Sequence, residues 1–218
     1  MIIDELEEVW RTTRVTDAVK PYLWSHDEFR GFLGEAQIEA VRRAHLLVDS
    51  TSPLTQPDVI AGELLVALDP RVISVRRVRT ASRGRALGRK SARDMDDEVP
   101  GWEDATPSCP IVFIPDYESN KLALWPPSKN DDTLRLTVIR EPLSLISEDS
   151  EELEIPPRYH LSLLYWVSYR AYMKPDADTL NPGEAKSALE HFEAEFGKRS
   201  AAIDEHWNAE QNHDLGDY

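Results

Sequence analysis

The sequence predicts an α+β fold that is mainly helical and carries an inserted small antiparallel β-sheet with a long loop. Apolar residues recur every three to four positions in the N-terminal and C-terminal parts of the chain, which is typical of helices. Between these parts, short runs rich in Val, Ile and Leu are separated by turn-forming residues, and one run alternates between apolar and polar side chains. We therefore expect a single domain over residues 1–218, with residues 60–142 as the β insertion.

Two helices are expected before the insertion. A short amphipathic helix is expected within residues 4–19. Ser25 and Glu28 have the spacing of a capping box, in which each side chain accepts a hydrogen bond from the other residue's N–H. The helix that this motif begins should cover residues 26–48, because an apolar stripe at three-to-four spacing continues through it: Phe29, Phe32, Leu33, Ala36, Ala40, Ala44 and Leu47.

Five strand-like runs make up the expected sheet, and the short turns between them favour antiparallel pairing. The clearest run is the last, because Leu134, Leu136 and Val138 alternate with polar residues. Residues 80–110 contain three prolines and are expected to leave the sheet as a long loop, a kind of segment that is usually functional or disordered. The runs are residues 64–68, 72–79, 111–114, 121–125 and 133–140.

Two further helices are expected after the insertion. Residues 159–173 are apolar or aromatic at eleven of fifteen positions, so this helix should be buried nearly all round. It is shorter than the roughly 20 residues that cross a bilayer, and we expect no membrane contact. Asn181 and Pro182 are typical of an N-cap and a first helical position, so an acidic C-terminal helix should begin there.

The composition excludes several classes of protein. At 41% apolar and 30% charged residues, the chain is typical of a globular protein rather than a disordered one. A single cysteine cannot form an internal disulfide, which fits a reducing compartment. Residues 1–8 contain four acids and no base, so no secretory signal is expected. The net charge of −15 argues against a protein whose whole surface binds nucleic acid or an anionic membrane.

Positive charge is concentrated in residues 71–93, the basic arm, which holds nine basic residues and no acid. The other 195 residues hold 16 bases against 40 acids, a net charge of −24. The basic arm could bind a partner, contact nucleic acid, or form a contact between copies of the chain. The alternative is a solvated loop whose charge is neutralised by the acids that follow it, Asp94, Asp96, Asp97 and Glu98. The nine basic residues are Arg71, Arg76, Arg77, Arg79, Arg83, Arg85, Arg89, Lys90 and Arg93.

No residue pattern indicates catalysis, and we expect no catalytic residue, no metal and no cofactor. Residues 84–91 resemble a phosphate-binding loop, but three residues instead of four separate the glycines, Arg89 precedes the lysine, and no helix is expected to follow. The six histidines do not form a two-histidine metal pair at helical spacing. Cys109 has no histidine near it in sequence and is expected to be a buried or half-buried thiol.

Several short motifs resemble, in the same order along the chain, those of tailed-bacteriophage head–tail connector, or adaptor, proteins. They span roughly residues 20–200 and include no catalytic signature. Gly31 and Gly34 depart from the family's first helix, where better helix formers are usual. The motifs are Tyr22-Leu23-Trp24-Ser25, Glu35-Ala36-Gln37 with Glu39-Ala40 and Arg42-Arg43, Leu68–Ile73, Val99–Trp102, Leu124–Pro127, Ile155–His160 and Tyr169–Tyr172.

The resemblance implies a virion structural protein that is not an enzyme, made in the host cytoplasm and located in the neck between capsid and tail. Members of the family form a ring, commonly of twelve copies, beneath the portal protein. The ring extends the DNA channel and offers a platform for a stopper or tail protein. DNA then passes through without specific binding, and an acidic lumen would help it to slide.

The resemblance also suggests roles for three groups of residues. The candidates for contacts between subunits are Arg71, Arg76, Arg77, Arg79, Arg83, Arg85 and Arg89. The candidates for a surface facing the lumen or the portal are Glu190, Glu193, Glu195 and Glu205. Residues 207–218, from Trp207 to Tyr218, are expected to be a flexible tail that docks on the portal. The alternatives are another neck or tail-completion protein, or a nucleic-acid-binding accessory protein that uses the basic arm.

Overall fold

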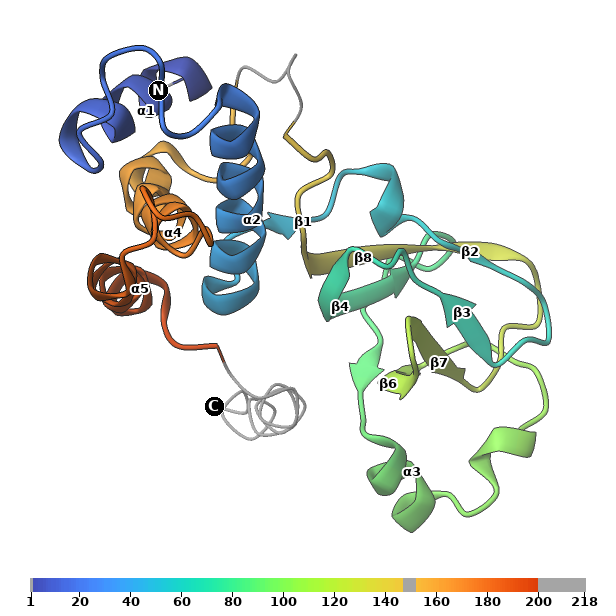
Figure 1. The fold of residues 1–218 in the computed structure, drawn as a ribbon. Coiled ribbons are helices and arrows are strands. Elements are labelled where there is room, and N and C mark those ends of the chain that lie inside the picture. Colours follow the sequence, from blue (N-terminus) through green and yellow to red (C-terminus); the bar gives the residue numbers. More distant parts are fainter. Residues whose placement is uncertain (1, 147–151, 200–218) are drawn as a thin grey trace. The chain divides into compact units, whose positions relative to one another are not determined.

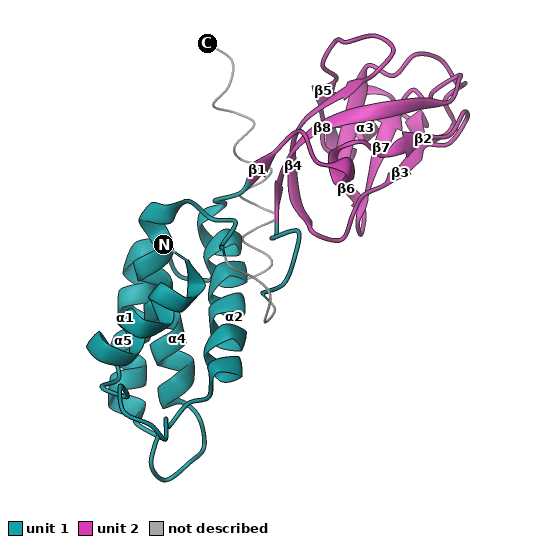
Figure 2. Ribbon diagram, turned by 90° about the horizontal axis from the view of Figure 1, so that it is seen from above, with its two compact units in different colours: residues 1–47, 141–209 teal, residues 48–140, 210–218 magenta. Residues whose placement is uncertain are grey.

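The computed structural model describes residues 2–146 and 152–199 of the chain, and the fold is α+β, as predicted (Figure 1). The described residues form two compact units (Figure 2). Unit 1 is helical and contains residues 2–47, 141–146 and 152–199, whereas unit 2 contains the strands and runs from residue 48 to residue 140. Unit 2 thus begins ahead of the predicted insertion, because the short strand β1 (Val48–Asp49) pairs with the last strand, β8 (Asp132–Arg140).

Unit 1 is built around helix α4 (His160–Tyr172), which packs against α1 (Ile3–Thr13), α2 (His26–Ala44) and α5 (Pro182–Phe196) (Figure 1). As predicted, α4 is buried on most sides, and Leu161 is its one exposed residue. Two tryptophans tie the N-terminal segment to this helix. The indole N–H of Trp10 donates to Ser168 Oγ and that of Trp24 donates to the carbonyl of Ala171, each at 3.1 Å.

A buried ionic cluster holds the loop between α1 and α2. The guanidinium of Arg11 lies 2.7 Å from carboxylate oxygens of both Glu7 and Asp17, and Nη2 donates to the carbonyl of Trp24 at 2.8 Å. Asp17 in turn accepts the N–H of Leu23 at 3.0 Å. Because Arg11, Glu7 and Asp17 are each less than 10% exposed, the loop depends on charges that are shielded from water.

The predicted helix starts are confirmed, and one predicted helix end is wrong. Ser25 and Glu28 form the capping box, and Asn181 Oδ1 accepts the N–H of Glu184 at 3.3 Å. The helix expected to reach residue 48 ends at Ala44, since His45 has a left-handed backbone, with φ 51°. The first helix ends at Thr13, where threonine hydroxyls bond to backbone carbonyls of the preceding turn, a competition that weakens helices.

Unit 2 contains two four-stranded sheets where the sequence predicted one. In the first, β8 is central, with β4 (Val72–Thr80) along one edge and the short strands β1 and β2 (Asp58–Val59) along the other. The second has the order β3-β7-β6-β5. Its strands are β3 (Leu65–Ala67), β5 (Gly88–Arg89), β6 (Val112–Glu118) and β7 (Lys121–Trp125).

The prediction of purely antiparallel sheets is wrong for one pair. Strands β5 and β6 are parallel, with Gly88 beside Val112 and Arg89 beside Phe113. The cause is the segment between them, which is not a hairpin. A parallel pair needs a crossover that returns the chain to the same end of the sheet, and a crossover usually contains a helix.

That crossover corrects a second prediction, the long loop at residues 80–110. It contains helix α3 (Ala92–Glu98) and the 3₁₀ turn η2 (Trp102–Asp104). Ser91 caps α3, since its hydroxyl accepts the N–H of Asp94 at 3.1 Å. Met95 and Trp102 are fully buried against the second sheet. The signal was present in the sequence as a Ser-x-x-Asp cap followed by apolar residues at helical spacing.

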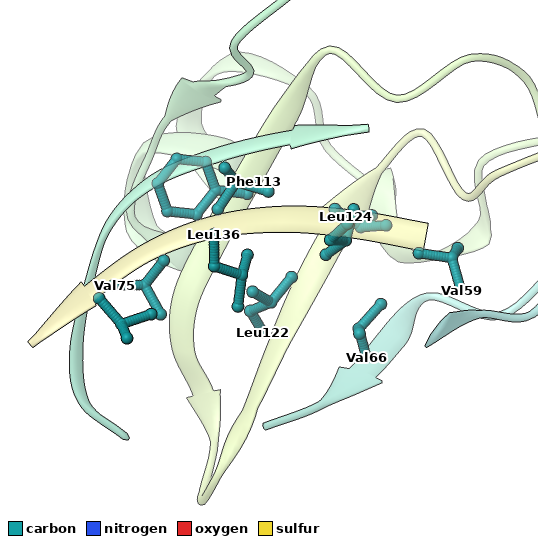
Figure 3. Packing of buried hydrophobic residues seen from close by; sticks show 10 residues of the cluster. Val59, Val66, Val75, Phe113, Leu122, Leu124 and Leu136 are labelled. Carbon is teal, nitrogen blue, oxygen red and sulfur yellow. The ribbon is translucent and has the colours of Figure 1, made fainter. Parts of the chain in front are cut away.

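Unit 2 is layered, and alternation along β6 and β7 defines the layers. Phe113, Leu122 and Leu124 point toward the first sheet and form the inner core with Val75, Leu136 and their neighbours (Figure 3). The residues next to these on the two strands point the other way, and Val112, Ile114 and Ala123 pack against Met95 and Trp102. The order of layers is therefore the first sheet, the inner core, the second sheet, and α3 with η2.

Candidate interaction surfaces

The basic arm begins with an arginine that is already paired within the chain. Arg71 follows the turn into β4, and its Nη2 lies 2.7 Å from Oδ2 of Asp69. The side-chain and backbone hydrogen bonds from Arg71 lower the pKa of Asp69 to about 2. Arg71 therefore serves the turn at the start of β4, in addition to any contact outside the chain.

Three arginines of the basic arm lie on one face of β4 because this strand contains a β-bulge. Arg76 is an extra residue in the register between β4 and β8. The bulge interrupts the alternation of side chains, so Arg76 and Arg77 are both exposed, whereas Val75 and Val78 on either side of them are buried. Arg79 is half-buried and continues the outer face toward the end of the strand.

The other basic residues of the arm lie beyond β4. Arg83 and Arg85 are exposed in the turn that follows β4, and Arg89 is half-buried on β5. Lys90 forms an ion pair with Glu98 of α3, and Arg93 is exposed on the same helix. The structure thus divides the arm between the two sheets and α3 instead of assembling it into one patch.

The acids that follow the arm serve partly to build α3. Asp94 accepts hydrogen bonds from Ser91 at the N-terminus of the helix, and Asp96 accepts the indole N–H of Trp102 at 2.9 Å. Glu98 pairs with Lys90, and Asp97 is exposed. Of the basic arm, Lys90 is therefore neutralised by one of these acids, on the side of unit 2 where α3 lies.

The carboxylates of α5 do not share one face. Glu190 is exposed and lies 3.9 Å from Lys186, while Glu193 is half-buried and lies 3.9 Å from Arg43 of α2. Glu195 is exposed on another side of the helix, because positions five apart are well separated around a helix of 3.6 residues per turn. Glu205, Trp207 and Tyr218 lie outside the described residues.

Features that suggested chemistry form no reactive site. A helix does follow the glycines at positions 84 and 88, contrary to expectation, but Gly88 belongs to strand β5, and Lys90 and the cap Ser91 separate this strand from α3. Among the described residues, no group of three or more His, Cys, Asp or Glu side chains could hold a metal ion. Cys109 is exposed rather than buried, because it lies on the loop that enters β6.

In residues 2–146 and 152–199, no helix has both the length and the apolar composition needed to span a bilayer. The family model of the SU10 adaptor protein matches residues 6–214 of the chain. The match extends over both units and includes every motif on which the resemblance to head–tail connector proteins rests. A search among curated proteins finds no match.

Proposed function

This chain belongs to the SU10 adaptor protein family, a family of bacteriophage head–tail adaptors, and we propose that it is the head–tail connector of its virion. The observation that carries the proposal is the match of the family model to residues 6–214. In this role, twelve copies form a ring in the neck, beneath the portal protein. The ring extends the DNA channel and provides the platform on which a stopper or tail protein assembles.

The charge of the chain suits a channel through which DNA slides. Outside the basic arm the net charge is −24, and carboxylates do not bind phosphates. Of the predicted lumen or portal-facing residues, Glu190 and Glu195 are exposed in the structure, on different sides of α5. We propose that the side with Glu190 faces the lumen; Glu195, about 140° further around the helix, then points to another side.

Electron microscopy of the chain mixed with the portal protein of its phage tests the proposal directly. A ring of the chain on the narrow end of the portal is the expected result. Monomers in the absence of the portal agree with the proposal, since assembly can depend on the partner. A chain that binds a purified tail component but never the portal would instead be another neck or tail-completion protein.

Residues 207–218 are proposed to dock on the portal. Deletion of these residues should abolish portal binding, and the melting temperature of the chain should stay within about 2 °C of the wild type, because polar terminal residues contribute little to a core. A deletion variant that binds the portal as the wild type does would remove this part of the proposal.

A nucleic-acid-binding accessory protein is the second candidate function. The exposed guanidinium groups of Arg76 and Arg77 favour it, because phosphates are natural partners of arginine. This function predicts binding of duplex DNA by the isolated chain, with an affinity that falls steeply between 50 and 200 mM salt, as is typical of phosphate contacts. Absence of binding at 50 mM salt would eliminate it.

A further inference from the structure

The outer face of the first sheet gathers four arginines, three from the basic arm and one that lies far from it in sequence. On β4 these are Arg76, Arg77 and Arg79, and on β8 the fourth is Arg135, which is exposed and lies directly opposite Arg79 in the antiparallel register. We call these four residues the arginine face. The opposite side of the same strands is apolar and closes the inner core.

The arginine face lacks counter-charges in the described part of the chain. Like charges directly opposite each other on neighbouring strands destabilise a sheet, and this is the arrangement of Arg79 and Arg135. Within residues 2–146 and 152–199, none of the four guanidinium groups has a carboxylate partner. A bound carboxylate would therefore relieve repulsion and form charge-assisted hydrogen bonds at the same time.

The other side of unit 2 carries the opposite charge. Met95 and Trp102 bury one side of α3 and η2 against the second sheet, so the carboxylates of this segment remain exposed. Glu98 is paired with Lys90, Asp96 accepts the indole N–H of Trp102, and Glu103 accepts the hydroxyl of Tyr117. The segment is still net negative, because residues 90–104 contain six acids and only two bases, Lys90 and Arg93. We call this surface the acidic face, and its residues are Asp96, Asp97, Glu98, Glu103 and Asp104.

The two faces are separated by the full thickness of unit 2. The arginine face is the outer side of the first sheet, whereas the acidic face lies beyond the second sheet, and the inner core lies between the sheets (Figures 1 and 3). One unit with complementary charges on opposite sides can contact identical copies head to tail. Contacts of this kind generate a ring when the rotation between copies closes.

We infer that the arginine face of one copy binds the acidic face of the next copy in the assembled adaptor. This inference rests on the proposed function and identifies the surfaces that form the ring. It adds Arg135 to the predicted contact residues, and it assigns Arg71, which is bound to Asp69, to the turn before β4. A second copy fits the arginine face better than DNA does, because the strongly acidic chain repels a polyanion and supplies carboxylates on the same unit.

Charge reversal of each face gives a sharp test. The first variant carries Arg77→Glu, Arg79→Glu and Arg135→Glu. The second carries Asp97→Lys, Glu103→Lys and Asp104→Lys, which spares the Asp94 cap and the bond between Asp96 and Trp102 but removes the acceptor of the exposed Tyr117 hydroxyl. Circular dichroism melts verify that both variants fold. Oligomers are then measured by mass photometry and electron microscopy, with the portal protein added if the wild type needs it.

Each variant alone should lose assembly, because its two faces then have the same sign and repel. An equimolar mixture of the two variants should assemble, since every contact in an alternating ring joins opposite charges. A chain that carries all six substitutions should assemble with itself, but it should not join wild-type rings. Assembly of the wild type should weaken as salt is raised from 50 to 500 mM.

Four results would overturn the inference. Assembly by either reversed variant alone at the wild-type level would leave the proposed function intact but exclude these faces as the contact. Failure of the mixture, with both variants folded, would exclude their pairing. Duplex DNA binding that is lost on reversal of the arginine face, with assembly unchanged, would assign that face to nucleic acid. A wild-type chain that assembles neither alone nor with the portal would overturn the proposed function and this inference together.

Discussion

Asp49 closes the base of unit 2, and Asp49→Asn should weaken that unit selectively. Asp49 lies on β1, where the chain enters unit 2, and its Oδ2 accepts a hydrogen bond from Arg140 at the end of β8, where the chain leaves. Its Oδ1 accepts the N–H groups of Thr51 at 2.9 Å and Ser52 at 3.1 Å. The side chains of the ion pair are only 7% and 11% exposed, so water replaces this interaction poorly.

The size of the effect follows from the bonds that change. Asp49→Asn keeps an oxygen for the N–H groups of Thr51 and Ser52, but turns an amide NH₂ toward the guanidinium. A hydrogen bond to a charged group contributes about 1.5–3 kcal/mol, and breaking a buried ion pair on one side costs about 3–5 kcal/mol. Because Arg140 makes further interactions, we expect the lower figures to apply, a loss of about 2–3 kcal/mol from the free energy of unfolding of unit 2.

Hydrogen exchange measured by mass spectrometry reports each unit separately. At pH 7, protected amides of β1, β4 and β8 should exchange roughly 30- to 150-fold faster in the variant, since 1.4 kcal/mol corresponds to a factor of ten. Amides of α2 and α4 should be unaffected. Asp69→Asn is the matched control, because the Asp69–Arg71 ion pair is more exposed, at 24% and 41%, and should contribute less than about 1 kcal/mol.

The effect should also depend on pH. Burial alone would raise the pKa of Asp49, but its hydrogen bonds outweigh burial and hold the pKa well below the ordinary value of 3.8. A carboxyl whose pKa is lowered by folding stabilises the protein fully above its unfolded pKa, and this contribution is lost as the pH falls toward the folded pKa. The difference between wild type and Asp49→Asn should therefore be about 1 kcal/mol smaller at pH 3 than at pH 7. Equal exchange in the two asparagine variants at pH 7, or a difference that does not shrink in acid, would refute this reasoning.

Three further predictions concern other parts of the chain. Arg11→Met leaves two buried carboxylates without their cation and should destabilise unit 1 by about 3–5 kcal/mol, measured by urea unfolding; an unchanged midpoint would contradict this. Gly31→Ala should raise stability by about 0.5–1 kcal/mol, since an added Cβ meets nothing within 4 Å, whereas Gly101→Ala, at φ +77°, should lower it by about 1 kcal/mol; melting temperatures that shift in the same direction would argue against both. Trp102→Ala should cost about 3–5 kcal/mol and make residues 92–104 sensitive to limited proteolysis, and cleavage at the wild-type rate would contradict the anchoring role of this side chain.

Local signals in the sequence predicted much of the fold. The capping box at Ser25 and Glu28, the cap at Asn181 and the alternation along β8 depend on neighbours in the chain, and the structure confirms all three. Helix α3 could also have been predicted, because Ser91 and Asp94 have the spacing of a helix cap and apolar residues follow them at helical intervals. The prolines of this segment favoured a loop, and packing of Trp102 on the second sheet outweighed that preference.

The arginine face could not be read from the sequence in the same way. Sequence reasoning groups charges that are close along the chain, which brought Arg71 and Arg93 into one arm with the arginines of β4. A sheet groups charges by register, and register places Arg135 opposite Arg79. The bulge at Arg76 has no local signature either, since it follows from how β4 pairs with β8. The parallel pairing of β5 and β6 is likewise a property of the assembled sheet.

The pairing of β1 with β8 has an evolutionary consequence. Val48 lies beside Ile139 and Asp49 beside Val138, so the two ends of unit 2 are on neighbouring strands, about 5 Å apart. A segment whose two ends are neighbours can be gained, lost or exchanged by recombination. When such a segment is removed, a short link can join the two cut ends of the remaining chain, because these ends already lie close together. Genetic exchange at this point would replace the arginine face and the acidic face together. If these two faces form the contact between copies, the helical unit could be inherited while that contact changes, and the adaptors of co-infecting phages would then not mix.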